Sequence, residues 1–183
     1  MDNNKVLYTK KKDVTIYLTP ENKLLVTATH VDFRHKMELE IKFSLPHLII
    51  EDVRSEMKRY PHEECIQARD SLRLMIGKQV KPGIMKTLKK LLGNKGCTHL
   101  TNLFQESCYS VIQGQGIARR QDLDSMVPGL SLEQTTKILI GLRPELVDSC
   151  FSYIAGGKFL RAAEQAVLPD NPRIEAFIKK NRF

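Results

Sequence analysis

The sequence contains no apolar run of the roughly 18–20 residues that a membrane-spanning helix requires. Its N-terminal stretch, MDNNKVLYTKKKD, lacks the apolar region of a secretory signal peptide. Its four cysteines include no C-x-x-C pair, and such widely spaced cysteines favour free thiols or metal ligands over a disulfide framework. These absences predict a cytoplasmic protein that does not associate with a membrane.

Several common catalytic motifs are also missing. The chain has no glycine-rich phosphate-binding loop, no G-x-S-x-G and no H-E-x-x-H. The stretch GQGIAR, residues 114–119, resembles a glycine loop, but it follows a predicted helix where a dinucleotide site requires a strand. The sequence therefore names no reaction, and whether the protein is an enzyme stays open, with a non-enzymatic role favoured.

Acidic residues are fewer than basic ones. The chain has 29 Lys and Arg against 21 Asp and Glu, which gives a formal net charge of +8. This excess indicates a protein partner or ligand of negative charge. No nucleic-acid-binding module is recognisable, and no aromatic residues interleave with the basic ones, so we do not expect nucleic acid to be the partner. The oligomeric state is not predicted.

The first third of the chain has the pattern of β-strands. Residues 14–19 and 24–31 are rich in β-branched side chains and are separated by the turn sequence Pro-Glu-Asn. Residues 37–43 alternate strictly, with Met37 and Phe43 at the ends of the apolar face, which is typical of a half-buried antiparallel strand. A further run follows at residues 49–57. We expect a β-meander of about four strands.

The remainder has helical patterns. We expect helices from Pro61 to Gly77 and over residues 82–93, and a third with Thr98 as its N-cap that ends in the glycine-rich stretch 113–116. Later helices include one with a Ser131 capping box and one that starts at Pro144. The predicted fold class is α+β, with packed helices after the sheet. The predicted domains are residues 1–116, an α+β domain with a candidate Cys/His site, and residues 117–183, a helical C-terminal extension.

Two cysteines lie where helices are expected to begin. Cys97 and His99 lie at the start of the third helix, and Cys65 lies in the first turns of the first helix. The positive end of a helix dipole favours a thiolate, which can act as a metal ligand or as a nucleophile. Packing is the alternative interpretation for Cys65 and the expected one for Cys108 and Cys150, because cysteines among apolar neighbours commonly act as small hydrophobic residues.

The order of these motifs resembles a known family. The stretch LLVTATHVDFRHKMELEIKF is followed by P-x-x-x-C, by Gly-Lys twelve residues later, and then by GCTHL. The sequence resembles, over about residues 7–113, the bacterial family catalogued as domain of unknown function 2889. The matching positions are Asp32, His35, Met37, Pro61, Cys65, Gly77, Gly96, Cys97, Thr98, His99 and Leu100. This resemblance implies a grouping by fold and no established activity.

The layout is also similar to the U-type iron–sulfur cluster scaffold proteins, which have a small antiparallel sheet followed by helices. That similarity implies ligands at the positions of Cys65 and Cys97, with His35 near the place of the scaffold's acidic ligand. The scaffold's first cysteine has no counterpart here, and its histidine precedes the third cysteine, whereas His99 follows Cys97. The implied metal-ligand set is Cys65, Cys97, His99 and His35, with Asp32 as an oxygen ligand or an acceptor that orients a histidine. Such a set suits zinc or a labile iron–sulfur centre.

Three functional hypotheses follow, beside the interpretation of the chain as a domain whose cysteines only pack. The leading one is a metal-binding or iron–sulfur scaffold or accessory protein. The second is an enzyme with Cys97 as nucleophile and His35 as base, because side chains two residues apart on a helix, such as those of Cys97 and His99, diverge. The third is a binding module for an acidic partner.

Overall fold

A computed structural model describes residues 4–181 of the chain. The chain divides into two compact units, Met1–Gln115 and Gly116–Phe183. The assignment of residues 1–116 as one domain and of residues 117–183 as a C-terminal extension stays a prediction. Within residues 4–181, no helix combines the length and the apolar character needed to span a membrane.

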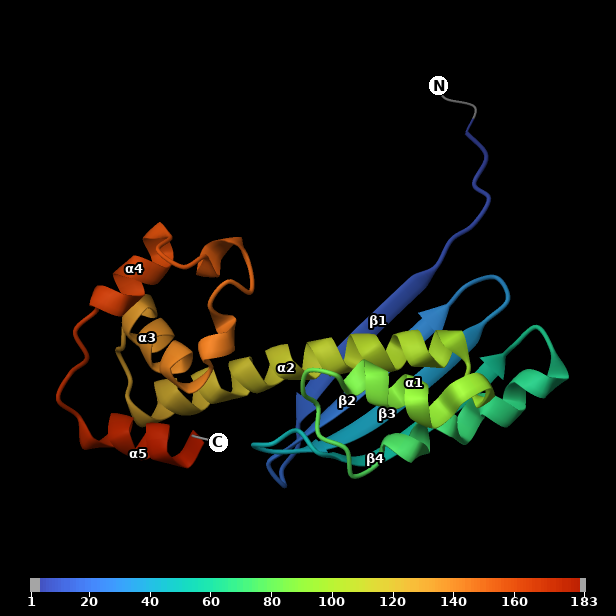
Figure 1. Ribbon diagram of the computed structural model, residues 1–183, viewed down its shortest axis with the longest axis horizontal. Coiled ribbons are helices and arrows are strands. Elements are labelled where there is room, and N and C mark those ends of the chain that lie inside the picture. Colours follow the sequence, from blue (N-terminus) through green and yellow to red (C-terminus); the bar gives the residue numbers. More distant parts are fainter. Residues whose placement is uncertain (1–3, 182–183) are drawn as a thin grey trace. The chain divides into compact units, whose positions relative to one another are not determined.

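The first unit contains a four-stranded antiparallel sheet, as expected (Figure 1). Its strands are β1 (Lys11–Leu18), β2 (Lys23–Val31), β3 (Lys36–Ser44) and β4 (Ile50–Arg59), and each pairs with the next along the chain. The alternation over residues 37–43 is confirmed, because Met37, Leu39, Ile41 and Phe43 are all buried. Together with the helices that follow, the sheet makes the predicted α+β fold.

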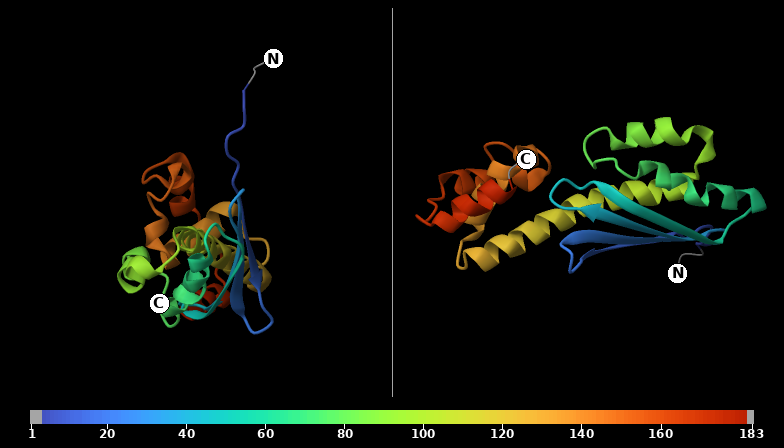
Figure 2. Two further views of the ribbon diagram at one scale, coloured as in Figure 1. Left: turned by 90° about the vertical axis from the view of Figure 1, so that its right-hand side faces the viewer. Right: turned by 90° about the horizontal axis from the view of Figure 1, so that it is seen from below.

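The helices of the first unit lie on one face of this sheet (Figure 2). They are η1 (Glu63–Met75), α1 (Ile84–Leu92), η2 (Gly93–Lys95) and the first part of α2 (Thr98–Met126). Their inward side chains, among them Leu72, Leu88, Leu100 and Phe104, form one hydrophobic core with the sheet. The predicted helix over residues 61–77 is present but is wound as a 3₁₀ helix, and Gly77 ends it with a φ of 81°.

Helix α2 does not end in the glycine-rich stretch 113–116, so that expectation is wrong. The helix continues without interruption to Met126. A Cβ atom built on Gly114 would lie 2.8 Å from Cγ2 of Ile16 on β1. The glycine at this position therefore permits a close approach between helix and sheet and does not mark a helix end.

The second unit is helical. After α2 it contains α3 (Leu132–Leu142), η3 (Pro144–Leu146), η4 (Phe151–Tyr153), α4 (Lys158–Gln165) and α5 (Pro172–Asn181). The predicted capping box is confirmed, because Ser131 and Gln134 each bond to the other's backbone N–H group. A separate core fills this unit, and its buried members are Leu123, Val127, Ile138, Leu142, Ile174 and Phe177.

The continuous helix expected from Pro144 is not present. Between η3 and η4 the backbone of Asp148 turns with a φ of 61°, and its side chain accepts a hydrogen bond of 2.8 Å from the backbone N–H of Ala155. Aspartate competes with helical hydrogen bonds in this way, which explains the break. Cys150 lies in this loop and is exposed, so its expected packing role is wrong, whereas Cys108 is buried as expected.

Candidate metal centre

The candidate site begins on the buried face of β2. Leu24, Val26 and Ala28 point into the core at every second position, and His30 continues the same alternation. Asp32, two residues further, is also buried. A histidine and an aspartate are thereby held at the end of a strand, beneath the turn that leads to β3.

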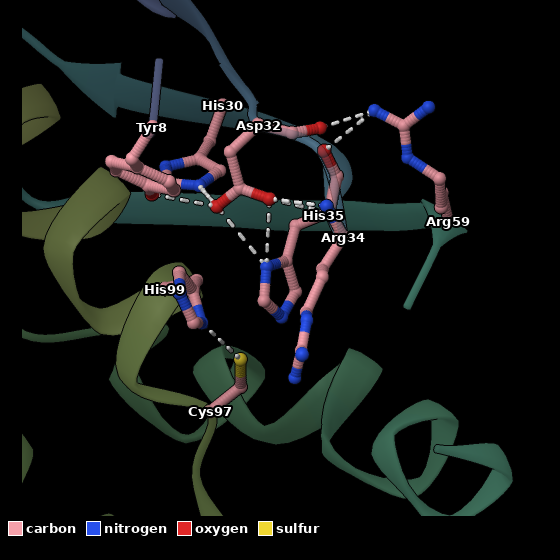
Figure 3. A network of polar contacts seen from close by, with 8 residues as sticks. All are labelled: Tyr8, His30, Asp32, Arg34, His35, Arg59, Cys97 and His99. Atoms are coloured by element: carbon pink, nitrogen blue, oxygen red, sulfur yellow. Dashed lines mark hydrogen bonds and ion pairs between the residues drawn. The ribbon is translucent and has the colours of Figure 1, made fainter. Parts of the chain in front are cut away.

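Asp32 holds this turn in place. Its Oδ1 accepts hydrogen bonds from the backbone N–H groups of Arg34 at 2.8 Å and His35 at 2.7 Å. The guanidinium of Arg59 on β4 donates to the backbone carbonyls of Asp32 and His35. These contacts fix both ends of the turn, so that the side chain of His35 returns toward Asp32 (Figure 3).

The Asp32 carboxylate also accepts hydrogen bonds from three side chains. His30 Nε2 and the Tyr8 hydroxyl each lie 3.0 Å from Oδ2, and His35 Nδ1 lies 3.1 Å from Oδ1. Since an ionised carboxylate only accepts, both histidine nitrogens carry the proton. Burial by itself would raise the pKa of Asp32, but hydrogen bonds from His30, from the Arg34 and His35 backbones and from Tyr8 outweigh it and hold the pKa far below its ordinary value.

His99 completes the cluster from the start of α2. The carbonyl of Cys97 accepts the hydrogen bond of the Thr101 N–H at 2.9 Å, so Cys97, and not Thr98, directly precedes the first helical turn. The His99 ring stacks on that of His35, with centroids 3.9 Å apart, and lies 5.0 Å from the ring of His30. Burial, followed by the neighbouring charges of His35 and His30, lowers the pKa of His99 and so favours the neutral imidazole.

Four side chains in this cluster are able to hold an ion together. His30, Asp32, His35 and His99 each offer one ligand atom, and all four atoms lie within 4.8 Å of one another. In a tetrahedral zinc site with bonds of about 2.0–2.1 Å, neighbouring ligand atoms lie roughly 3.3 Å apart. Side-chain movements that shift the ligand atoms by about 1 Å would therefore bring these four atoms to the distances of a zinc site.

The structure brings together three of the five residues expected from the sequence, namely Asp32, His35 and His99. Cys97 lies beside the group, with Sγ 4.0 Å from Nδ1 of His99. Cys65 is half-buried and packs against the core of sheet and helices, and within residues 4–181 no cysteine belongs to the group of close ligand atoms. Sequence reasoning missed His30, although its place in the buried alternation of β2 is a signal that could have found it.

A comparison with family models gives the grouping of the chain. The model described as "Protein of unknown function (DUF2889)" matches residues 10–113, which is more than half of the sequence. The chain belongs to this family. The DUF2889 match includes the whole His/Asp cluster and Cys97, and it ends within α2. No curated protein and no solved structure matches the chain, and the resemblance to iron–sulfur scaffold proteins is not shown.

Proposed function

We propose that this DUF2889 protein binds one transition-metal ion through His30, Asp32, His35 and His99, and acts as a metal-binding accessory or carrier protein. The observation that supports the proposal is the gathering of these four ligand atoms within 4.8 Å. The alternative is that these side chains only hold the β2–β3 turn in place. That role would require Asp32 and the groups that donate hydrogen bonds to it, but it would not require His99, whose ring comes from a distant helix and whose polar contact is with Cys97.

The donor set favours zinc as the first ion to test. Three imidazoles and a carboxylate suit zinc, and they also suit iron(II) and manganese(II). An iron–sulfur cluster takes cysteine thiolates as ligands, and the four-residue group contains none. Asp32 would offer Oδ2 to the ion while Oδ1 continues to accept from the turn. Each histidine would bind the ion as a neutral imidazole, through a ring nitrogen that carries no proton.

Metal analysis of the purified protein tests this proposal. After zinc loading and removal of free ion, we expect about one zinc per chain in the wild type, as a single four-ligand site predicts. His99→Ala is the most informative variant, because it leaves the hydrogen bonds of Asp32 intact. His62→Ala is its matched control, since His62 is exposed and lies outside the cluster. Zinc at background in the wild type, or equal zinc in both variants, would overturn the proposal.

Cobalt substitution tests the part of the cysteines. A cobalt(II) ion bound by imidazoles and a carboxylate gives visible ligand-field bands, and a thiolate ligand adds a charge-transfer band in the near ultraviolet. We expect no such band in the wild type and no spectral change in Cys65→Ser or Cys97→Ser. A charge-transfer band that disappears in either variant would show that a thiolate belongs to the ligand set, as the sequence-based hypothesis holds.

The contact between Cys97 and His99 supports a second candidate function, a cysteine nucleophile. Cys97 precedes the helix, so the argument that these two side chains must diverge does not apply, and His99, whose Nδ1 lies 4.0 Å from the Cys97 Sγ, becomes the candidate base. Alkylation of the metal-free protein by iodoacetamide tests this role. If His99 assists the thiol, Cys97 reacts more slowly in His99→Ala while the exposed Cys150 reacts at an unchanged rate. Equal rates of Cys97 alkylation in both proteins would exclude it.

A further inference from the structure

One segment of the first unit carries no acidic residue. Residues 71–105 contain neither Asp nor Glu, and the nearest acids are Asp70 and Glu106. We call residues 71–105 the acid-free segment. It contains seven basic residues, which are Arg73, Lys78, Lys81, Lys86, Lys89, Lys90 and Lys95.

The positive charges of this segment have no partners within the described part of the chain. All seven side chains are exposed, and none takes part in an ion pair among residues 4–181. Some lysines elsewhere in the same unit do form ion pairs. Lys23 pairs with Glu51 at 2.6 Å, and Lys58 pairs with Glu38 at 2.6 Å. The acid-free segment therefore carries seven positive charges and no negative charge that could offset them.

The acid-free segment includes the end of η1, all of α1 and η2, and the start of α2. Helix α1 lies against both η1 and η2 and is farther from the sheet than η1 (Figure 2). On α1 the three lysines occupy positions 86, 89 and 90, which share one helix face, and the buried Leu88 and Leu92 occupy the opposite face. The basic side chains consequently project outward from a helix that the core holds in a fixed orientation.

The other side chains of the segment indicate what the surface binds. Leu74, Ile76 and Leu91 are exposed among the basic residues, with 53%, 37% and 40% of their surface accessible. Phe104, the one Phe, Tyr or Trp residue of the segment, is fully buried, so no ring of these three types is available to stack on a base. Six of the seven charges are lysines, which bind as point charges and do not offer the planar fork that suits phosphate.

From this combination we infer that the acid-free segment is a docking surface for an acidic segment of a partner protein, one in which apolar side chains lie between the carboxylates. The lysines would attract the carboxylates, and the exposed Leu and Ile side chains would bury the apolar residues. A phosphate backbone offers nothing to those apolar side chains. The inference does not depend on the metal centre.

Fluorescence anisotropy with labelled probes tests the inference. The probes are a peptide of Glu-Glu-Leu repeats, a Glu-Glu-Ser peptide of equal length and charge, and a DNA duplex of equal charge. We expect the Glu-Glu-Leu peptide to bind most tightly, with a dissociation constant that rises as salt is increased from about 50 to 200 mM, because added ions screen exposed charges. Tightest binding of the duplex would assign the surface to nucleic acid, and no binding of the Glu-Glu-Leu peptide would refute the inference.

A pair of triple variants locates the effect. Lys86→Gln, Lys89→Gln and Lys90→Gln together should weaken peptide binding about tenfold, which corresponds to about 1.4 kcal/mol. The control variant Lys158→Gln, Arg161→Gln and Lys179→Gln removes the same number of exposed charges from the second unit. We expect it to leave the dissociation constant within about twofold of the wild type, since these three residues lie outside the acid-free segment. Equal losses in the two variants would show that net charge alone drives binding, and would overturn the inference.

Discussion

Replacing the Asp32 carboxylate by an amide should destabilise the first unit far more than its small change in shape implies. In Asp32→Asn the amide oxygen can still accept the hydrogen bonds of the two backbone N–H groups of the turn. The amide NH₂ group then faces His30 Nε2 and the Tyr8 hydroxyl, which both donate to Oδ2 in the wild type. A hydrogen bond to a charged group contributes about 1.5–3 kcal/mol, and two are lost. The His30 bond is buried, whereas Tyr8 is about half exposed and its bond competes with water, so we expect a loss of about 2 kcal/mol.

The free energy of unfolding of the first unit can be followed by tyrosine fluorescence in urea. Four of the five tyrosines lie before residue 116, so the signal reports mainly on that unit. The protein is kept metal-free, so that an ion does not contribute to stability. Asp52→Asn is the matched control, because Asp52 forms an ion pair with Arg54, whose side chain is largely exposed, and such pairs contribute at most about 1 kcal/mol.

The pH dependence provides the decisive check. The pKa of Asp32 is lowered in the folded chain, so its carboxylate stabilises the fold at any pH above its unfolded value of about 3.9. That contribution is lost progressively as the pH falls below this value. The stability difference between wild type and Asp32→Asn should therefore be constant near neutrality and shrink in acid. A difference below about 1 kcal/mol at pH 7, or one that does not change down to pH 3, would refute the reasoning.

Three further predictions concern the packing. Gly114→Ala should destabilise the first unit, because its Cβ atom would press against Ile16 on β1. Gly116 has open space around it, so Gly116→Ala should stabilise the helix by up to about 1 kcal/mol. Urea unfolding of the two variants tests both expectations. Burial raises the pKa of Cys108 to about 12, so native protein should be alkylated by iodoacetamide at Cys150 and not at Cys108, as peptide mass mapping would show. Ser131→Ala should cost the second unit about 1 kcal/mol through loss of the capping box, measured by thermal unfolding, and an unchanged melting temperature would contradict that role.

The sheet could be predicted from the sequence because its signal is local. Residues 37–43 alternate because one face of the strand is buried and the other is not, and this alternation is visible within a few consecutive residues. The end of α2 could not be predicted in that way. Gly114 has the residue type of a helix end, yet its role depends on Ile16, which lies nearly a hundred positions earlier in the chain. A single sequence indicates only the usual role of such a glycine, because it does not show which residue packs against Gly114 in the fold.

The candidate site shows the same division. Asp32, His35 and His99 were selected because two sequence motifs contain them, and the structure brings them together. His30 was assigned to a predicted strand and not to the site, although it occupies a buried position of β2. Cys65 was selected because it lies near a helix start, but it packs on the core side of η1. The start of a helix defines an electrostatic environment without defining which residues face it, and that second property depends on how the helices pack.

The origin of His99 in a different part of the chain has a consequence for proteostasis. Three of the four cluster residues are close neighbours along the chain, and the fourth reaches them only when α2 has docked onto the sheet. An ion that requires all four would select the completed fold over every partly assembled form. At a free concentration about 100 times its dissociation constant, such an ion would add about 2.7 kcal/mol to the native state. The cellular supply of the ion would then govern how long each newly made chain survives degradation.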